Sequence, residues 1–511
     1  MIWRALKPST TEAGAALGSA VLFALAFPPL HLIVPVFVCL VPLAVFVGRR
    51  AETGATGAAA RVGFWFALLA FGSTLYWIAV ALLLFTKLAI LAYIATVLCL
   101  GGIYAATLAI LSMARRLTGW PMAVLLPPLW VASEMLLMHL GDISFPWLPL
   151  ALGVSHSPHL AQLADVSGEH GLSAFIAVIN GLLADAVLTR RRAWNVGIAV
   201  ACGIGLYAYG AWRLATITLR PLAPVLAVQP NIPEDEKMQQ ALRTKFIGIL
   251  MDRTRAGLAA GQPALIVWPE TALPDFLVQH KDWSDSLRAL AATSHVPLLF
   301  GVIDLQWYPN GTYDFYNAAL LADTTGAISR QPPYRKEFLV PIVERVPFIN
   351  PKWFAGLKYF GGFGRGSHPV PFALPFGKVG VVICYESIFG DLFQWYRRKG
   401  ADAILNITND AWFGETNAPY QHVAHLRLRA IENRIGIVQV ANTGISEYVD
   451  PVGRAHGQTT LSTPAAVVYH VETTDVRTLY DAWGDWIGYL SVVVTLAFFL
   501  ASFRRGPRAL S

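Results

Sequence analysis

The sequence predicts a multi-pass α-helical membrane domain combined with a soluble α/β sandwich domain. Composition predicts the membrane part, because 55% of the 511 residues are hydrophobic and only 14% are charged, against about 25% charged in ordinary globular chains. Pattern predicts the sandwich, because near-continuous apolar runs such as 379–383 are typical of strands covered on both faces of a sheet. The same composition excludes a disordered chain, a collagen-like repeat and a disulfide scaffold.

Eight apolar stretches predict membrane-spanning helices, since each is close to the roughly 20 residues that a helix needs to cross a bilayer. They lie near residues 14–30, 32–48, 62–84, 88–112, 121–138, 171–188, 194–212 and 485–503. No evident small-residue cleavage site follows Arg4 and Lys7, so we expect the first stretch to remain as an anchor. Glu134 and Asp185 lie near span ends and are expected to face protein or water.

The basic residues predict the orientation of these spans. Successive loops lie on opposite sides of the membrane, so every second loop lies on the same side. The loops and the tail on one side contain Arg49, Arg50, Arg61, Arg115, Arg116, Arg190, Arg191, Arg192, Arg504, Arg505 and Arg508. By contrast, residues 117–189 contain neither Lys nor Arg. Because basic loops favour the cytoplasm, we expect both termini inside the cell and residues 213–484 outside the cytoplasm.

This topology predicts three parts of the chain. A transmembrane domain of about seven helices covers 1–212, the soluble domain covers 213–484, and a transmembrane helix with a cytoplasmic tail covers 485–511. Most of the net charge of +7 then belongs to membrane-flanking loops, so we expect no nucleic-acid partner.

The soluble domain is expected to alternate strands with amphipathic helices, which predicts an α/β sandwich. The predicted strands are 223–230, 264–268, 297–303, 317–322, 378–384, 402–407, 436–441 and 466–471. The predicted helices are 235–257, 283–294, 388–399 and 418–433.

One cysteine stands apart from the other three. Cys39, Cys99 and Cys202 lie in apolar stretches, where a cysteine usually behaves as a small hydrophobe. Cys384 is the only cysteine of the soluble domain, so it has no partner there for a disulfide, and no Cys/His zinc spacing surrounds it. A cluster in a loop outside the cytoplasm also lacks metal-ligand spacing, so we expect no metal; it comprises His139, His156, His159 and His170.

Three segments place reactive side chains where functional groups of α/β folds tend to lie, at the ends of strands. Glu270 follows a strand that ends at Trp268, Lys336 follows Tyr334-Arg335, and Cys384 ends the strand 378–384. A cysteine thiol needs a base to become a nucleophile, and Glu270 can serve if a dry pocket raises its pKa. Lys336 can stabilise the oxyanion of a tetrahedral intermediate, so the trio predicts acyl transfer through a thioester.

The order Glu, Lys, Cys resembles the carbon–nitrogen hydrolase (nitrilase) superfamily, whose αββα sandwich carries that triad. With seven spans before the domain and one after it, the chain is similar to the apolipoprotein N-acyltransferase family within that superfamily. Further matches to this family are Val228-Gln229-Pro230-Asn231-Ile232-Pro233, Phe145-Pro146-Trp147-Leu148, Asn409-Asp410-Ala411-Trp412-Phe413-Gly414 and Ala441-Asn442-Thr443-Gly444-Ile445-Ser446. The resemblance covers nearly the whole chain.

The resemblance implies roles for individual residues. Glu270 would be the general base, Lys336 the oxyanion stabiliser and Cys384 the nucleophile. The supporting residues of the family's pattern match Glu344, Tyr385 and Glu386. A phospholipid would acylate the cysteine, and the α-amine of the N-terminal S-diacylglyceryl-cysteine of a lipoprotein would take the acyl chain. The resemblance further implies a bacterial inner-membrane enzyme with a periplasmic catalytic domain and no cofactor; nothing requires more than a monomer.

Several positions depart from the family's pattern. Met238 stands where the family usually has Trp, and Ile342 and Val343 stand where it commonly has Phe-Gly before the second glutamate. Near the end of the domain, Glu432-Asn433-Arg434-Ile435 stands where the common pattern is Glu-x-Gly-Arg. These departures concern the acceptor side of the pocket more than the triad.

A glycine-rich segment, 346–363, is dense in aromatic residues. Such residues are usually core, but this density in a loop favours a mobile lid that dips into the membrane surface. The predicted lid and lipid contacts are Trp353, Phe354, Tyr359 and Phe360. Lys352 and Lys358 are expected to meet lipid phosphates.

Two other functions remain open from the sequence. One keeps the fold and uses water as the acceptor, which would make the protein a membrane-tethered amidase. The other is a non-catalytic membrane module for protein recognition, against which the presence of all three triad residues argues. Consumption of lipid with an amine acceptor separates these alternatives.

Overall fold

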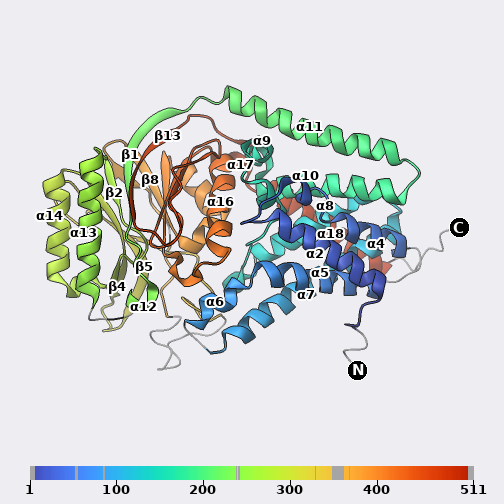
Figure 1. The fold of residues 1–511 in the computed structure, drawn as a ribbon, viewed down its shortest axis with the longest axis horizontal. Helices are drawn as coiled ribbons and strands as arrows, with labels where there is room; N and C mark the ends of the chain where they lie inside the picture. The colour runs from blue at the N-terminus through green and yellow to red at the C-terminus, as the bar shows by residue number, and fades with distance from the viewer. Residues whose placement is uncertain are drawn as a thin grey trace. The chain divides into compact units, whose positions relative to one another are not determined.

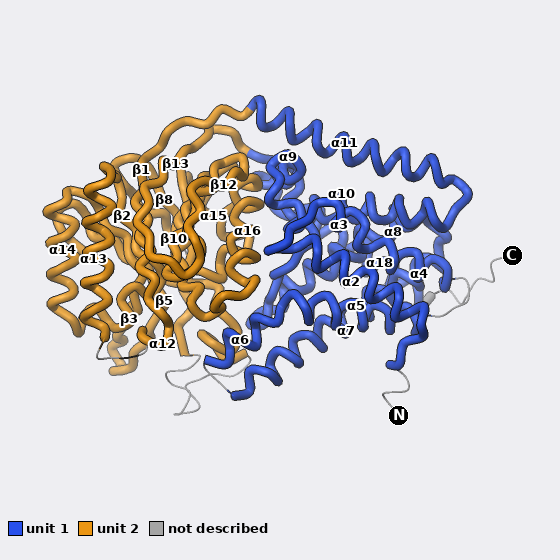
Figure 2. The backbone as a smooth tube through the Cα atoms, in the orientation of Figure 1, with its two compact units in different colours: residues 1–216, 478–511 blue, residues 217–477 orange. Residues whose placement is uncertain are grey.

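The computed structural model describes residues 6–51, 56–84, 87–237, 239, 242–328, 330–347, 362–367 and 369–504. The chain forms two units, which Figure 2 shows in different colours. Unit 1 contains residues 1–216 and 478–511, and unit 2 contains residues 217–477. The domain limits predicted from the sequence concern where the chain leaves the membrane, and they stay a prediction.

Unit 1 is helical throughout its described elements (Figure 1). Its longer helices are α2 (Thr10–Ala26), α4 (Val41–Ala51), α5 (Thr56–Thr74), α7 (Ala89–Thr118), α8 (Met122–Met138), α10 (Ala164–Leu188), α11 (Arg192–Thr216) and α18 (Trp486–Arg504). Its shorter helices are α3 (Ile33–Val36), α6 (Trp77–Leu83), α9 (Pro158–Ala161) and α17 (Leu479–Trp483).

Several of these helices are apolar enough to cross a membrane. Four described stretches have the required length, and a fifth does if α5 and α6, bent by 54°, form one span. The four are Ile33–Ala51, Ala89–Thr118, Ala164–Leu188 and Arg192–Thr216. Three further apolar helices are shorter, Thr10–Ala26, Met122–Met138 and Trp486–Ser502. A helical region with several apolar helices is therefore confirmed, whereas the count of eight spans is not.

Small residues let neighbouring helices of unit 1 approach closely, as in many membrane helix pairs. A Cβ added to Gly63 of α5 would lie 2.3 Å from the carbonyl oxygen of Tyr104 in α7. A Cβ on Gly181 of α10 would lie 2.5 Å from Ala123 of α8. Next to this contact, the buried carboxylate of Asp185 accepts hydrogen bonds from the backbone N–H groups of Met122 and Ala123. Asp185 thus faces protein and caps the N-terminus of α8.

Unit 2 is built on two β-sheets. The first runs in the order β13 (Ala465–Thr473), β1 (Arg220–Gln229), β2 (Leu265–Val267), β4 (Leu298–Trp307), β5 (Tyr313–Ala322) and β6 (Tyr334–Arg335), with β3 (Leu273–Phe276) paired to β4. The second runs in the order β12 (Ala455–His456), β11 (Glu447–Val449), β10 (Gly436–Ala441), β9 (Ala403–Thr408), β8 (Gly377–Ile383) and β7 (Phe372–Leu374). The central strands are parallel, β1 to β2 to β4 in one sheet and β8 to β9 to β10 in the other.

Alternating side chains of each strand divide the core of unit 2 into two parts. In β1, Val225 and Ala227 belong to the cluster between the sheets, and Leu226 and Val228 belong to the cluster under the outer helices. Figure 1 shows α13 (Arg243–Ala260) and α14 (Lys281–Ser294) over one sheet, and α16 (Ala418–Asn433) over the other. With α15 (Gly390–Arg398) packed on β8, the unit is a helix–sheet–sheet–helix sandwich.

One helix that the sequence predicts in unit 2 is divided in the structure. The expected helix 235–257 is two helices, α12 (Glu234–Lys237) and α13. The ammonium of Lys237 is buried and donates to the carbonyl of Glu270 at 3.5 Å, a tertiary contact at the end of α12. Five short strands were also missed: β3, β6, β7, β11 and β12.

Candidate active site

Two of the predicted site residues come from different sheets of unit 2. Glu270 follows β2 of the seven-stranded sheet, and Cys384 follows β8 of the six-stranded sheet. Each therefore lies beyond the carboxyl end of a parallel strand, where ligands of α/β sheets commonly bind. The backbone N–H of Asn409, directly after β9, donates to Glu270 Oε2 at 2.8 Å and so connects the two sheets at this end.

A buried ion cluster surrounds Lys336. Its Nζ lies 2.9 Å from Glu344 Oε1 and 3.4 Å from Glu270 Oε1. Asn317, on β5, donates through one nitrogen to both carboxylates, at 2.7 Å to Glu270 and 2.9 Å to Glu344. The backbone N–H of Val340 binds the other oxygen of Glu344 at 2.8 Å. The structure thus brings Glu270, Lys336 and Glu344 together in one buried cluster.

Burial and neighbouring charges together set the proton affinities in this cluster. Burial raises the pKa of Glu270, more than the ammonium of Lys336 lowers it, and the charge of Glu344 raises it further. Burial alone would lower the pKa of Lys336, but the carboxylates of Glu344 and Glu270 outweigh it and raise that pKa. Glu270 is therefore a stronger base than an exposed carboxylate, beside a lysine that stays charged.

Cys384 begins the short 3₁₀ helix η7 (Cys384–Ile388) and is only 6% exposed. Its φ of +53° is unusual for a residue with a side chain, so surrounding contacts must hold this conformation. Burial raises the pKa of the thiol, and the charge of Glu270 raises it further while Lys336 lowers it. The thiol is thus protonated at rest and lies within electrostatic reach of both a base and an ammonium.

Glu386 ties the cysteine turn to the lysine loop. Its Oε1 accepts from the backbone N–H groups of Glu337, at 2.6 Å, and Phe338, at 3.1 Å. Its Oε2 accepts from the Tyr334 hydroxyl at 2.6 Å and from Ile383 N–H at 2.7 Å. Burial raises the pKa of Glu386 to about 7. These four bonds join the turn at Cys384 to the loop that carries Lys336, and a role of Glu386 in positioning both residues stays a prediction.

The two halves of the chain match two family models. Residues 19–182 match the apolipoprotein N-acyltransferase N-terminal domain, and residues 218–478 match carbon-nitrogen hydrolase. An apolipoprotein N-acyltransferase of Brucella melitensis is 32% identical over 461 residues, which is 87% of this chain and 85% of that protein. The chain belongs to the apolipoprotein N-acyltransferase family.

Other members of the family match along almost the whole length. The apolipoprotein N-acyltransferase of Geobacter metallireducens is 29% identical over 505 residues, covering 95% of this chain and 94% of that protein. Among solved structures, an amidase from Nesterenkonia sp. is 19% identical with a TM-score of 0.36, covering 53% of this chain and 97% of the amidase. The family membership and the enzyme class predicted from the sequence are confirmed, whereas the roles of single residues stay a prediction.

A second polar group lies beside Cys384 and comprises Ser387, Asp410 and His422. The sequence did not indicate a role for it. Nε2 of His422, on α16, lies 3.0 Å from the carbonyl oxygen of Cys384 and 2.8 Å from the Ser387 hydroxyl, and Nδ1 lies 3.1 Å from Asp410. Burial lowers the pKa of His422, but the charge and hydrogen bond of Asp410 together with the hydrogen bond to Cys384 outweigh it, and the net shift is upward. Asp410 lies in a family motif of the sequence, which was the available signal for this group.

The same group has ligand atoms arranged compactly. Sγ of Cys384, a carboxylate oxygen of Asp410 and a ring nitrogen of His422 lie within 4.8 Å of one another. The expectation of no metal rested on spacing along the sequence, which does not reveal this trio because the fold brings its members together. Thiol, imidazole and carboxylate are the ligand set that Zn²⁺ accepts in proteins.

The structure describes three of the residues that depart from the family's pattern, Ile342, Val343 and Arg434. Ile342 has a φ of +71°, in the turn that carries Glu344. Arg434 ends α16 with a φ of +48°, is fully buried, and donates to the carbonyl of Pro451 at 3.2 Å. Val343 donates its N–H to the carbonyl of Pro341 at 2.9 Å. Met238 lies outside the described residues.

The predicted lid residues also lie outside the described residues; they are Trp353, Phe354, Tyr359 and Phe360. Two backbone hydrogen bonds connect the described residues after that segment with Glu344 and Lys336 before it. The N–H of Phe363 donates to the carbonyl of Glu344 at 3.2 Å, and the N–H of Gly366 donates to the carbonyl of Lys336 at 2.8 Å. Tyr385 is buried, and its ring packs edge-on against Phe389.

Proposed function

We propose that this protein is an apolipoprotein N-acyltransferase that works through a thioester on Cys384. The observation that carries the proposal is the buried cluster of Glu270, Lys336 and Glu344 beside the thiol, in a chain of that family. A base with raised pKa, a fixed cation and a protonated thiol are the groups that cysteine acyl transfer requires.

In the first step, a phospholipid ester acylates the cysteine. Glu270 accepts the proton of the Cys384 thiol as the sulfur attacks the ester carbonyl, and Lys336 stabilises the oxyanion. The intermediate collapses with cleavage of the carbon–oxygen bond. Glu270 returns the proton to the leaving oxygen, which releases a lysophospholipid and leaves a thioester.

In the second step, an amine replaces the sulfur. The α-amine of an S-diacylglyceryl-cysteine at the N-terminus of a lipoprotein attacks the thioester carbonyl. Glu270 takes a proton from the attacking nitrogen, the carbon–sulfur bond breaks, and the proton passes to the thiolate. Burial of the site supports an amine over water as acceptor, since Glu270 and Lys336 are 3% and 1% exposed.

The proposal includes a topology. Eight spans hold unit 1 in the bacterial inner membrane, both termini are cytoplasmic, and the catalytic unit is periplasmic. The arginine-rich loops on one side of the predicted spans support this orientation.

A transfer assay tests this function. The full-length protein in detergent is mixed with a phospholipid labelled in its acyl chains and a diacylated lipopeptide with a free N-terminal amine. We expect labelled triacylated peptide whose bond resists hydroxylamine, as an amide does. An N-acetylated peptide is the matched control and should gain no label. Release of free fatty acid with no labelled peptide would instead establish a hydrolase.

A further inference from the structure

The predicted base Glu270 lies in a turn whose backbone is strained. Thr271, the residue that follows it, has a φ of +42°, which is a rare conformation for a β-branched side chain. Strain of this kind persists only where surrounding contacts hold the backbone, and it is common at functional sites. The contacts that hold this turn therefore also fix the position of the base.

Both sheets contribute contacts to the turn. Gly301 of β4 lets it approach closely, since an added Cβ would lie 2.4 Å from the carbonyl oxygen of Pro269 and 2.7 Å from the Cα of Glu270. From the other sheet, the backbone N–H of Asn409 donates to Glu270 Oε2 at 2.8 Å. Neither of these two contacts involves the carbonyl of Glu270 or the side chain of Thr271.

Lys237, the last residue of α12, contacts exactly those two groups. Its Nζ donates to the carbonyl oxygen of Glu270 and to the hydroxyl of Thr271, both at 3.5 Å. Hydrogen bonds of this length are weak, so the effect of the ammonium on the turn is mainly electrostatic. The lysine is only 4% exposed, so bulk water does not screen its charge.

The charge of Lys237 has no close counter-ion among the described residues. No carboxylate oxygen of theirs lies within 4.0 Å of its Nζ, whereas Lys336 has two such neighbours. Burial lowers the pKa of Lys237, and the charges of Glu234 and Glu270 oppose this shift without cancelling it. A buried ammonium without an ion pair is costly to the fold, which points to a role in function.

The first residue of α12 is also connected to the base. Glu234 Oε2 accepts from the side-chain amide of Asn409 at 2.8 Å, and the backbone N–H of Asn409 binds Glu270. The side-chain oxygen of Asn409 accepts in turn from Asn442 at 2.8 Å. Contacts at both of its ends therefore fix α12 relative to Glu270.

Two sequence motifs that the mechanism does not use support α12. Asn442, from the segment 441–446, accepts from the N–H of Ile232 at 3.0 Å and donates to its carbonyl at 2.7 Å. The N–H of Asn231 donates to the carbonyl of Asn442 at 3.0 Å. The segment 228–233 is thus paired with Asn442, and this pairing fixes where α12 begins.

We propose that Lys237 is a positioning residue that holds Glu270 in place for proton transfer and gives this base a second neighbouring cation. Lys237 contacts the backbone of the base and not the reacting atoms, so it acts through Glu270. The inference deepens the proposed function and rests on it, because it requires that Glu270 is the base for Cys384.

The charge of Lys237 should be visible in the pH dependence of acylation. Burial raises the pKa of Glu270, Lys336 lowers it and Glu344 raises it, and Lys237 is a further cation that lowers it. Because Glu270 acts only when deprotonated, loss of the Lys237 charge should move the rising limb of the rate to higher pH. The other charged or titratable groups around the cluster stay the same in each variant; they are Glu234, Cys384, Glu386, Asp410 and His422.

Three variants of the full-length protein separate the charge of Lys237 from its hydrogen bonds. Lys237→Gln keeps a donor without the charge, Lys237→Met removes both, and Lys237→Arg keeps the charge. Acyl-enzyme formation from a phospholipid is timed by intact mass from pH 5 to 9. We expect the rising limb to move up by about half to one pH unit in the Gln and Met variants and to stay in place in the Arg variant. The plateau rate should fall by about tenfold in the Met variant and by less in the Gln variant.

Thermal stability distinguishes this role from a structural one. Because an ammonium without a counter-ion is costly to bury, the melting temperature of Lys237→Met should stay the same or rise. A melting temperature that falls while the rising limb stays in place would show that Lys237 only supports the fold, and it would overturn the proposal.

The matched control is Lys245→Gln. Lys245 is an exposed lysine of α13 that pairs with Glu236 of α12 at 3.7 Å, so its loss disturbs α12 without changing the charge beside the base. It should leave the rising limb and the plateau unchanged. A limb that stays in place in Lys237→Gln, or that moves equally in Lys237→Arg or in the control, overturns the proposal. Failure of the proposed function looks different: the unchanged protein would then form no acyl adduct at any pH.

Discussion

The ammonium of Lys336 lies closer to Glu344, at 2.9 Å, than to the predicted base Glu270, at 3.4 Å. The lysine therefore shares its charge between two carboxylates, and Asn317 donates to both of them. This arrangement leaves Glu270 only partly neutralised, so that it can still accept a proton. Several consequences can be measured.

Removing the charge of Glu344 should move the pH dependence of acylation. Glu270 must be deprotonated to act, so the rate rises as pH passes upward through its pKa. Glu344 raises that pKa; with Glu344→Gln the pKa falls and the rising limb shifts to lower pH. Because Lys336 then pairs with Glu270 alone and weakens the base, we expect the plateau rate to fall by about 100-fold. Rates of acyl-enzyme formation from pH 5 to 9 would measure both effects.

Asn317→Asp should shift the rising limb of the acylation rate against pH in the opposite direction. It replaces a donor to Glu270 with a third acid in the cluster, which raises the pKa of Glu270. The rising limb then moves to higher pH. Asn310→Asp, a change on an exposed loop of the same unit, serves as the control. Equal shifts in both variants would contradict the assignment of the limb to Glu270.

Glu386→Gln should impair the positioning of Lys336 and Cys384 more than the binding of lipid. Its carboxylate accepts four hydrogen bonds, two of them from the loop after Lys336 and one from Ile383 before the nucleophile. An amide accepts through one atom only, so two donors lose their partners. We expect acylation to slow by about 10- to 100-fold, with a lower melting temperature and little change in the KM for lipid. An unchanged rate would argue against the positioning role.

His422 should support acylation by holding the backbone of Cys384 in place. Its Nε2 lies 3.0 Å from the carbonyl of Cys384, whose positive φ needs support. His422→Ala should slow acylation about tenfold, and His422→Gln should recover part of the loss because an amide can donate to that carbonyl. Measured rates for the two variants at equal thermal stability test this order.

The proposed topology can be tested by labelling single cysteines in cells. Val278, 77% exposed in unit 2, is replaced by cysteine in one variant, and Arg191, in a predicted cytoplasmic loop, in another. A membrane-impermeant maleimide that reaches the periplasm should label the Val278→Cys protein above the background of the four native cysteines. The Arg191→Cys protein should react only after the inner membrane is opened. The reverse pattern would overturn the orientation.

The sequence was sufficient for the central parallel strands of both sheets and for the positions of Glu270 and Cys384 at strand ends, because buried parallel strands are continuous apolar runs and functional groups follow their ends. It was insufficient for the partners of these residues. Asn317 lies within a strand, and nothing local distinguishes an amide that bridges two carboxylates from one on a surface. Its role depends on which loops the fold brings against β5.

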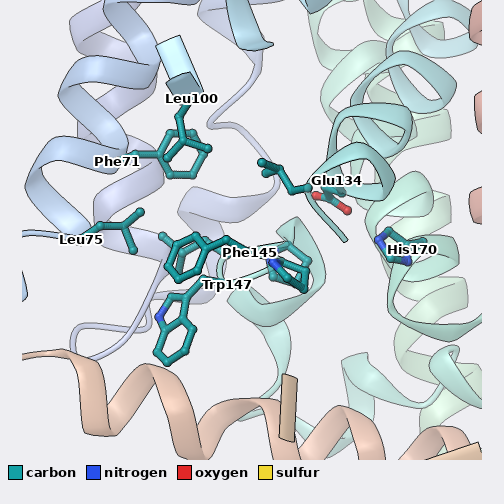
Figure 3. A pocket seen from close by; sticks show the side chains of 11 residues that line it. Phe71, Leu75, Leu100, Glu134, Phe145, Trp147 and His170 are labelled. Carbon is teal, nitrogen blue, oxygen red and sulfur yellow. The ribbon is translucent and has the colours of Figure 1, made fainter. Parts of the chain in front are cut away.

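The membrane part shows a different limit. Hydropathy located the apolar helices of unit 1, but helices such as α2 and α8 have 17 residues each, so apolarity alone does not decide whether they cross a bilayer. The closeness of Glu134 and His170 was equally invisible in the sequence, where Glu134 is only an acid near a span end. Tertiary packing brings the two buried side chains together (Figure 3).

Intact mass spectrometry of the full-length protein after mixing with phospholipid tests the central claim most directly. We predict a mass gain of one acyl chain, absent with Cys384→Ala and lost on treatment with hydroxylamine, as expected for a thioester. The gain should also disappear when a diacylated lipopeptide with a free amine is added. No gain with any phospholipid, or a gain that persists with Cys384→Ala, would contradict acyl transfer through this cysteine.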